Sequence, residues 1–259
     1  MPELPEVETY RRYFESTSLN QKIINLKIRD DRILNLKEKA LKNSIIGNSF
    51  HSTHRHGKNL FIKFEKKYLM LHFGMSGDLL YFTKEREEPK HSRVLFIFEN
   101  HNFLSYISQR LFGKVDIVSD IDNYIKKKEL GPDAYKMSYK DFKDALQKRS
   151  AYAKTLLMNQ SFVAGIGNIY SDEILFQANI HPKTKINSLD KKNLDMLFKS
   201  IKAVLKTGIE KKGNLDKFPK NYLIPYRQRE EQCPECNTEI KRYEISGRHG
   251  FFCPHCQIK

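Results

Sequence analysis

The residues with the clearest chemistry in this sequence are its four cysteines, which form two Cys-x-x-Cys pairs. Cys233 and Cys236 make the first pair, and Cys253 and Cys256 make the second. Two pairs at this spacing are typical of a tetrahedral zinc site with four thiolate ligands, and they leave no thiol for a disulfide or for catalysis. We therefore expect one structural Zn²⁺ ion, which does no chemistry itself and holds a small hairpin.

A second group with chemical potential is Pro2, which lies between Met1 and Glu3. A small residue after Met1 permits removal of the methionine, which would leave Pro2 with a secondary amine. An α-amino group has a pKa of about 7.7–8.0, so a useful fraction is neutral at pH 7 and can form a Schiff base with an electrophilic carbon. Glu3 could donate or accept a proton beside it. Most proteins that begin Met-Pro use neither residue, so this pattern alone decides nothing.

Four further segments have both a binding and a non-binding interpretation. The turn 165–168, Gly-Ile-Gly-Asn, could present helix N–H groups to a phosphate or be an ordinary tight turn. Met75, between two glycines, could fill a buried gap or wedge into a base stack. Arg110 and Phe112 pair a guanidinium with an aromatic ring, or simply end a strand. Arg248, in the glycine-flanked segment 246–250, could clamp a phosphate, or the ribbon could dock a protein.

Three closely spaced histidines do not predict a second metal site. His54 and His56 would share one face of a strand, and His51 lies nearby. No neighbouring carboxylate or cysteine completes a ligand set, so we expect no metal there.

Composition favours a partner that is a polyanion. The chain has 259 residues, is 39% hydrophobic and carries a formal net charge of +15. Such charge is either a solvated lysine-rich surface or a binding surface, most commonly for nucleic acid. No apolar run approaches the roughly 20 residues that cross a membrane, and no signal-peptide pattern is present. We expect a cytoplasmic, nucleoid-associated protein, because a reducing compartment suits thiolate zinc ligands.

Hydrophobic periodicity predicts a β-rich part followed by a helical part. A helix is expected over 5–15, and strands with alternating apolar residues over 22–118, with a hairpin turn at 100–102. The lysine run 126–128 reads as a linker. Helices are expected between 138 and about 212, with Ser138 and Ser188 as N-caps.

In combination and in order, these segments closely resemble the formamidopyrimidine-DNA glycosylase family, relatives of endonuclease VIII. The resemblance runs from residue 2 to the end of the chain, and it is carried by the runs 2–8 (Pro-Glu-Leu-Pro-Glu-Val-Glu), 57–58 (Gly-Lys), 72–77 (His-Phe-Gly-Met-Ser-Gly), 110–113 (Arg-Leu-Phe-Gly), 153–158 (Ala-Lys-Thr-Leu-Leu-Met), 163–173 (Val-Ala-Gly-Ile-Gly-Asn-Ile-Tyr-Ser-Asp-Glu), 181–182 (His-Pro) and the terminal cysteine pairs.

The resemblance implies a two-lobed α+β enzyme that acts on damaged double-stranded DNA as a monomer. It implies an N-terminal β-sandwich lobe over 1–125, a helix–two-turn–helix domain over 132–222 and a zinc-finger hairpin over 227–259. The implied activity is excision of oxidised bases such as formamidopyrimidines, followed by strand cleavage through β,δ-elimination at the resulting abasic site.

The resemblance also implies roles for single residues. Pro2 would be the nucleophile at C1′, Glu3 the general acid, Lys58 a phosphate ligand that assists β-elimination, and Arg248 a phosphate clamp that assists δ-elimination. The remaining implied roles are DNA contacts by His72, His91, Arg110, Arg149, Lys154 and Asn168, and filling of the emptied duplex position by Met75, Arg110 and Phe112.

One departure from the family pattern bears on the substrate. Members that prefer 8-oxoguanine usually have a long loop after the last helix of the helical lobe, and here the segment 213–219 runs quickly to Tyr226. We therefore expect 8-oxoguanine to be poorly capped. The alternatives left open are an endonuclease VIII-like preference for oxidised pyrimidines, hydantoins or abasic sites, a DNA-damage sensor without catalysis, and a zinc-ribbon docking factor.

Overall fold

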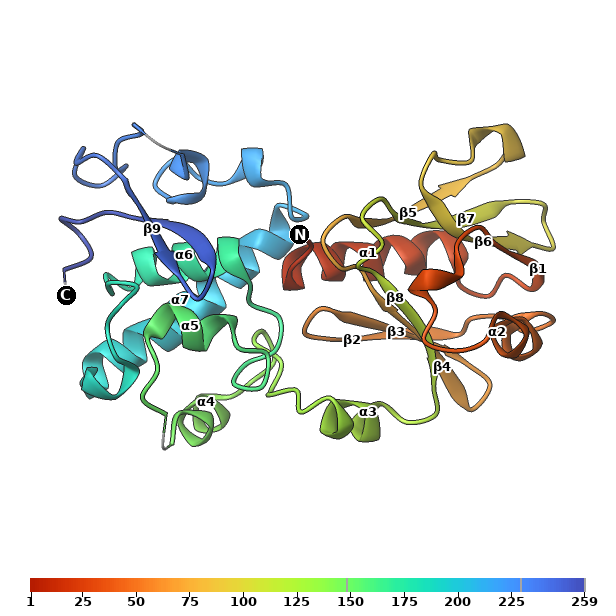
Figure 1. Ribbon diagram of the computed structural model, residues 1–259, viewed down its shortest axis with the longest axis horizontal. Helices are drawn as coiled ribbons and strands as arrows, with labels where there is room; N and C mark the ends of the chain where they lie inside the picture. Colours follow the sequence, from red (N-terminus) through yellow and green to blue (C-terminus); the bar gives the residue numbers. More distant parts are fainter. Residues whose placement is uncertain (148, 229, 259) are drawn as a thin grey trace. The chain divides into compact units, whose positions relative to one another are not determined.

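The protein, described here by a computed structural model, folds into two compact units (Figure 1). Residues 1–147, 149–228 and 230–258 are described. The first unit contains Met1–Pro2 and Glu6–Lys128, and the second contains Glu3–Pro5 and Glu129–Lys259. Within the described residues, no helix has both the length and the apolarity needed to span a membrane.

The first unit contains two four-stranded antiparallel sheets, as the period-two pattern predicts. One sheet has the order β1-β6-β7-β5 and the other the order β2-β3-β4-β8. The strand bounds are β1 (Ile23–Ile28), β2 (Ser52–His56), β3 (Asn59–Phe64), β4 (Lys67–His72), β5 (Gly77–Phe82), β6 (Ser92–Phe98), β7 (Phe103–Ser108) and β8 (Lys114–Val118). The expected turn at 100–102 joins β6 to β7, with His101 at a positive φ of 60°.

The core of this unit lies between the two sheets. Apolar residues two apart on β3 and β6 are fully or almost fully buried in one cluster. Helix α1 (Leu4–Ser18) adds Val7 and Phe14 to that cluster, and Figure 1 shows it running alongside both sheets. The unit also contains η1 (Asp31–Ile33), α2 (Glu38–Ile45), η2 (Glu85–Glu87) and α3 (Ile121–Lys127). The prediction of a linker at 126–128 is wrong for its first two lysines, which end α3.

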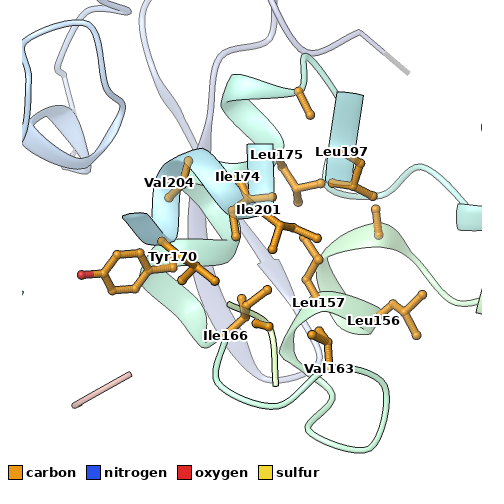
Figure 2. Packing of buried hydrophobic residues seen from close by; sticks show 14 of the residues in the cluster. Leu156, Leu157, Val163, Ile166, Tyr170, Ile174, Leu175, Leu197, Ile201 and Val204 are labelled. Carbon is orange, nitrogen blue, oxygen red and sulfur yellow. The ribbon is translucent and has the colours of Figure 1, made fainter. Parts of the chain in front are cut away.

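The described residues of the second unit form four α-helices: α4 (Tyr139–Leu146), α5 (Ala153–Met158), α6 (Asn168–Gln177) and α7 (Lys191–Glu210). Three short 3-10 helices connect and follow them: η3 (Ile186–Ser188), η4 (Leu215–Lys217) and η5 (Ile224–Tyr226). Figure 2 shows how α5, α6 and α7 pack, with Leu157, Ile174 and Ile201 among the buried side chains between them.

The two predicted helix caps have different outcomes. Ser138 caps α4 in a capping box with Asp141, as expected. The prediction of Ser188 as the cap of α7 is wrong, because Asp190 caps that helix by accepting a hydrogen bond from the Asn193 backbone N–H. Ser188 lies instead in η3, where its hydroxyl donates to the Lys185 carbonyl.

The chain ends in an antiparallel hairpin of β9 (Lys241–Ile245) and β10 (Arg248–Phe252). A two-residue turn joins the strands, and both of its residues, Ser246 and Gly247, have positive φ, of 50° and 68°. Two positive φ values match the strand twist in a tight hairpin, and glycine accepts that conformation without strain. The turn therefore sets Arg248 as the first residue of β10, next to the tip.

Candidate functional site

The Glu3 side chain is fixed by the backbone at the start of α6. Its carboxyl group accepts hydrogen bonds from the N–H of Gly167 and, at 2.9 Å, from the N–H of Ile169. The side chain is 1% exposed. The turn that could have bound a phosphate thus uses these N–H groups to hold Glu3, because a helix N-terminus attracts a carboxylate as it does a phosphate.

The two glycines of this turn are required by the close approach of the N-terminal segment. A Cβ on Gly167 would lie 2.6 Å from Oε1 of Glu3, and a Cβ on Gly165 would lie 2.6 Å from Cδ1 of Leu4. Gly165 also has a φ of +117°, which other residues rarely adopt. Its carbonyl accepts the Leu4 N–H at 3.0 Å. Residues 3 and 4 are therefore seated against the turn.

The structure gives Lys154 a different environment from the expected DNA contact. The side chain is 0% exposed, and its ammonium donates to Oδ1 of Asp172 at 2.6 Å and to the Asn168 carbonyl at 2.7 Å. Burial lowers the pKa of Lys154, and the Asp172 carboxylate opposes that shift. In this arrangement the ammonium is not accessible to a phosphate. Its hydrogen bonds connect α5 to the first turns of α6.

Asn168 and Arg248 lie close together in the same unit. The Asn168 side-chain amide donates to the carbonyl of His249, the residue after Arg248, at 2.9 Å. Arg248 and His249 are exposed, and the hairpin tip contacts α5 through Ser246 and Thr155, whose hydroxyls are 3.2 Å apart. Two residues predicted to bind phosphate, Asn168 at the start of α6 and Arg248 at the start of β10, are therefore linked through the hydrogen bond to His249.

The four cysteines form a site that fits one zinc ion. Their Sγ atoms lie within 4.8 Å of one another, with Cys233 and Cys256 at 3.8 Å and Cys236 and Cys253 at 3.5 Å. A tetrahedral ion with Zn–S bonds of about 2.3 Å separates its sulfur ligands by roughly 3.8 Å. Among the described residues this is the one cluster of metal-ligand type. The hairpin β9–β10 connects the two cysteine pairs, so the metal fixes its base.

Lys58 and His72 are brought together in the first unit. Lys58 directly precedes β3, and Asn59 of that strand pairs with His72 at the end of β4. Burial and the nearby Lys58 charge lower the pKa of His72 from 6.5 to about 4. The imidazole is therefore neutral at pH 7, and its Nδ1 accepts the Gly74 N–H at 3.3 Å.

A buried ion pair supports the turn that carries Lys58. Arg55 donates to the Gly57 carbonyl at 3.1 Å and to Glu8 of α1 at 3.2 Å. Burial would raise the pKa of Glu8, but its hydrogen bond to Arg11 and the charges of Arg11 and Arg55 outweigh this and hold it at about 2. Glu8 is therefore ionised near neutral pH and keeps Arg55 in place.

The residues expected to fill an emptied duplex position lie on two packed loops. Met75 is 41% exposed in the β4–β5 loop, and Phe112 is 55% exposed in the β7–β8 loop. The loops touch, since a Cβ on Gly74 would lie 2.5 Å from the Phe112 carbonyl oxygen. Arg110 lies over the Phe112 ring at 5.5 Å, and its N–H donates to the Ser76 hydroxyl at 3.0 Å. Exposed apolar side chains at a loop tip have no role in the core.

The two remaining predicted DNA contacts are less constrained by their surroundings. His91 is half-buried before β6, and its carbonyl accepts the Ser108 N–H at 3.1 Å, at the sheet end where Gly77 pairs with Ser108. Arg149 is half-buried between α4 and α5, and its N–H donates to the Leu146 carbonyl at 3.0 Å.

Sequence reasoning missed the polar residues that hold the second unit together. Asp172 and Glu173 of α6 are both fully buried. Glu173 accepts the Ile224 N–H at 2.7 Å, and burial raises its pKa to about 7. Arg227 donates to Asp172 at 2.6 Å. The sequence feature that could have indicated these contacts is the pair of adjacent acidic residues in an apolar helix, because buried carboxylates need hydrogen-bond or charge partners.

The short segment after α7 is folded onto the helical core. Phe218 is buried with its ring 6.1 Å from that of Tyr170, and the hydroxyls of Tyr222 and Thr207 are 2.9 Å apart. The segment 211–227 contains η4 and η5 rather than an extended loop.

Comparison with known proteins accounts for almost the whole chain. The family model for the formamidopyrimidine-DNA glycosylase N-terminal domain matches residues 1–115. The model for the H2TH domain of the same glycosylase matches residues 130–219, and that for a zinc finger found in FPG and IleRS matches residues 230–258. The chain belongs to the formamidopyrimidine-DNA glycosylase family. The resemblance expected from the sequence and the α+β fold class are confirmed.

Individual members of the formamidopyrimidine-DNA glycosylase family match over their full length. The formamidopyrimidine-DNA glycosylase of Streptococcus thermophilus (strain CNRZ 1066) is 33% identical, with 99% of each chain covered. That of Streptococcus pyogenes serotype M3 is 34% identical, covering 100% of this chain and 99% of the relative. The latter alignment extends over 273 positions, whereas this chain has 259 residues, so the relative contains residues with no counterpart here.

Solved structures of Lactococcus lactis Fpg share the fold. Its complex with DNA containing FAPY-dG has a TM-score of 0.91 and 31% identity, covering 99% of this chain and 100% of that one. Its non-covalent complex with DNA containing an AP site has the same TM-score, identity and coverage. The zinc-finger match and the thiol geometry together identify Cys233, Cys236, Cys253 and Cys256 as the ligands of one structural zinc ion.

Proposed function

We propose that this protein is a base-excision repair DNA glycosylase with AP lyase activity that acts on damaged double-stranded DNA. The observation that carries the proposal is the seating of Glu3, the residue after Pro2, on the N–H groups that open α6. A carboxyl group fixed in this way is held for chemistry next to the candidate amine. The neighbouring Asn168–His249 contact brings the hairpin residue Arg248 to the same helix.

The proposed reaction begins with Pro2, which becomes a secondary amine once Met1 is removed. The amine attacks C1′ of the damaged nucleotide while Glu3, in its protonated form, gives its proton to the sugar ring oxygen, so that the bond between C1′ and the ring oxygen breaks. The bond between C1′ and the base then breaks, and the base leaves with the proton that the proline nitrogen loses. The Schiff base then acidifies the C2′ protons, so β-elimination follows from the same covalent intermediate. Lys58 binds a phosphate and assists this step, and Arg248 clamps phosphates and assists δ-elimination.

Binding of damaged DNA requires extrusion of the nucleotide, which costs about a few kcal/mol. Met75 and Phe112 are proposed to offset that cost by entering the emptied position with Arg110, because all three come from the two packed loops. The remaining proposed contacts to DNA are His72, His91, Arg149 and Asn168. Lys154 is proposed to support Asn168 from within the unit, since its ammonium binds the Asn168 carbonyl.

The decisive experiment is borohydride trapping on a duplex with one abasic site. Protein with Met1 removed should give a covalent adduct, and peptide mass spectrometry should place it on Pro2. The same protein with Met1 retained is the matched control, because its proline nitrogen is an amide. Lys58→Met should still form the adduct, since the lysine is not the nucleophile.

The result that overturns the proposal is the absence of an adduct from protein whose Met1 removal has been verified. A protein that binds the duplex tightly but neither traps nor cuts would be a damage sensor without catalysis. The fixed position of Glu3, which binding alone does not need, speaks against that alternative.

The preferred lesion is a separate proposal. The segment 211–227 is short and folded onto the helical core, and a relative that matches the full chain contains residues with no counterpart in this sequence. We propose that 8-oxoguanine is therefore poorly capped and that formamidopyrimidines, hydantoins, oxidised pyrimidines or abasic sites are better substrates. Excision rates on a panel of duplexes, each with one lesion, test this lesion preference. The proposal is rejected if 8-oxoguanine opposite cytosine is excised efficiently and is the best substrate.

Three further expectations stay proposals. The division into a catalytic lobe over 1–125, an H2TH domain over 132–222 and a zinc-finger hairpin over 227–259 is one. A monomer is the second, and a cytoplasmic, nucleoid-associated location is the third. Light scattering of the free protein and fluorescence imaging of a tagged chain test the last two.

A further inference from the structure

Asp172 accepts hydrogen bonds from four residues of the second unit, and the reaction proposed above does not require it. It lies on α6 and is 0% exposed. Oδ1 accepts from the Lys154 ammonium at 2.6 Å and from the Tyr243 hydroxyl at 2.7 Å. Oδ2 accepts from the Arg227 guanidinium at 2.6 Å and from the Phe251 N–H at 3.1 Å.

The donors to Asp172 come from elements that are far apart in the sequence. Lys154 belongs to α5, Arg227 follows η5, and Tyr243 and Phe251 lie on the two strands of the zinc hairpin. Both strands are therefore bound to one carboxylate on α6. A buried carboxylate that compensates two cations and accepts from the hairpin cannot be lost without leaving charges unpaired.

Gly250 allows this close approach of the hairpin to α6. It pairs with Tyr243 across the hairpin, and a Cβ at position 250 would lie 2.6 Å from the Tyr243 hydroxyl and 2.7 Å from Oδ1 of Asp172. Arg248 is two residues before Gly250, and the Asn168 amide holds the carbonyl of His249 between them. The position of Arg248 relative to α6 is thus set by contacts on the residues that follow it.

The zinc ion cannot set that position alone. The four cysteines lie at the base of the hairpin, after Phe252 and before Lys241, whereas Arg248 lies next to the tip. The metal fixes the two ends of the hairpin to each other. The bonds to Asp172 fix the middle of the hairpin to the helix whose N-terminus holds Glu3.

We propose that Asp172 is a positioning residue that locks the zinc hairpin onto α6, so that Arg248, Asn168 and the turn holding Glu3 act as one rigid constellation on DNA. The functional part of this inference rests on the proposed glycosylase and lyase activity. Its structural part concerns the hairpin itself and is measured without any reaction.

The mildest test removes one hydroxyl from the network. Tyr243→Phe deletes the hairpin's side-chain bond to Asp172 and keeps the ring. Tyr222→Phe is the matched control, because it deletes a half-buried hydroxyl paired with Thr207 in the same unit and does not touch the hairpin. Both variants are made in the zinc-loaded full chain, and zinc content is measured for each.

The structural readout is amide hydrogen exchange over residues 241–252. Loss of one hydrogen bond of about 1 kcal/mol corresponds to roughly fivefold faster opening. Tyr243→Phe should accelerate exchange in the hairpin by about that factor with one zinc per chain retained. Tyr222→Phe should leave exchange in the hairpin as in the unaltered protein.

The functional readout is affinity for a duplex with a stable abasic-site analogue, together with the ratio of δ- to β-elimination products on a true abasic site. A displaced Arg248 should weaken binding by roughly three- to tenfold and shift products toward β-elimination in Tyr243→Phe. The rate of borohydride trapping should change less, because Pro2 and Glu3 do not depend on the hairpin tip. A merely stabilising hydroxyl would leave the product ratio unchanged.

A stronger variant extends the test. Asp172→Asn removes the charge, and Asp172→Asn combined with Lys154→Met also removes the ammonium that would be left unpaired. If the single variant fails to fold, the double variant and Tyr243→Phe carry the test. Hairpin exchange and product ratio equal to those of the unaltered protein in Tyr243→Phe would overturn the inference. A different pair of results would reject the proposed reaction and keep the structural part of the inference. In that case the unaltered protein would form no borohydride-trapped adduct, and hairpin exchange would be accelerated by Tyr243→Phe but not by Tyr222→Phe.

Discussion

Glu3 and Ile169 are joined by a hydrogen bond of 2.9 Å from the Ile169 N–H to Oε1 of Glu3, although 166 positions separate them in the sequence. The Gly167 N–H donates to the other carboxyl oxygen. One side chain thus satisfies two N–H groups that the start of a helix leaves without helical partners. The consequence is that a candidate catalytic carboxyl depends on a glycine in another part of the chain.

Gly167→Ala should therefore impair base excision without preventing folding. The added methyl would lie 2.6 Å from Oε1 of Glu3 and push the carboxyl group away. A misplacement of about 1 Å typically costs roughly a hundredfold in rate. Single-turnover excision of a formamidopyrimidine lesion measures the effect. Gly47→Ala is the control, because its methyl would meet nothing within 4 Å, even though Gly47 has a positive φ of +89° and Gly167 has a φ of −130°.

Truncation of the exposed loop side chains should weaken action on duplex DNA. Met75→Ala and Phe112→Ala each remove apolar surface proposed to replace stacking, which is worth about 1–3 kcal/mol per base. We expect excision from a duplex to fall by roughly tenfold or more, and excision from single-stranded DNA to change little. Leu80→Ala is the control, since Leu80 is 39% exposed on β5 outside the two loops. Equal losses for Leu80 and Phe112 would contradict the wedge assignment.

His72 should titrate well below an ordinary histidine. Its pKa is lowered to about 4 by burial and by the Lys58 charge, so the folded protein resists protonation that the unfolded chain accepts below about pH 6.5. Stability contributed by neutral His72 is then lost as the pH falls from about 6.5 through about 4. NMR titration of the imidazole checks the value. Lys58→Met should raise the pKa of His72 but leave it below 6.5, because burial remains, whereas Lys63→Met on β3 should leave it unchanged.

Removal of zinc should abolish DNA binding while the first unit stays folded. The four thiolates hold the base of the hairpin that carries Arg248, and structural zinc sites couple metal binding to folding. Fluorescence anisotropy with a lesion duplex after chelation measures the loss, and added Zn²⁺ should restore binding. Amide exchange in β3 and β6 should stay slow throughout. Full-strength binding by metal-free protein would show that the hairpin has no part in the interface.

Much of the fold was predictable because its signals are local. Alternating apolar residues on β3 and β6 predict strands that contribute every second side chain to the core between the sheets, and Ser138 with Asp141 predicts a helix start. The Ser188 cap failed for a local reason too, since Asp190 offers an equally good acceptor two residues later. Periodicity reports which face is buried and says little about which of two neighbouring caps is used.

The functional residues likewise include some that local sequence patterns predict and others whose contacts form only when the chain folds. The spacing of Cys233, Cys236, Cys253 and Cys256 by itself determined a zinc site, since a metal selects its ligands by chemistry and short-range geometry. The sequence could not show that Lys154 is buried, because a lysine is normally exposed and only the paired carboxylate of Asp172 makes its burial tolerable. The seat of Glu3 on α6, the contact of the Met75 and Phe112 loops, and the locking of the hairpin on Asp172 were decided only by the tertiary structure. Each depends on groups that chain folding brings together from distant positions, and no pattern along the chain encodes such pairings.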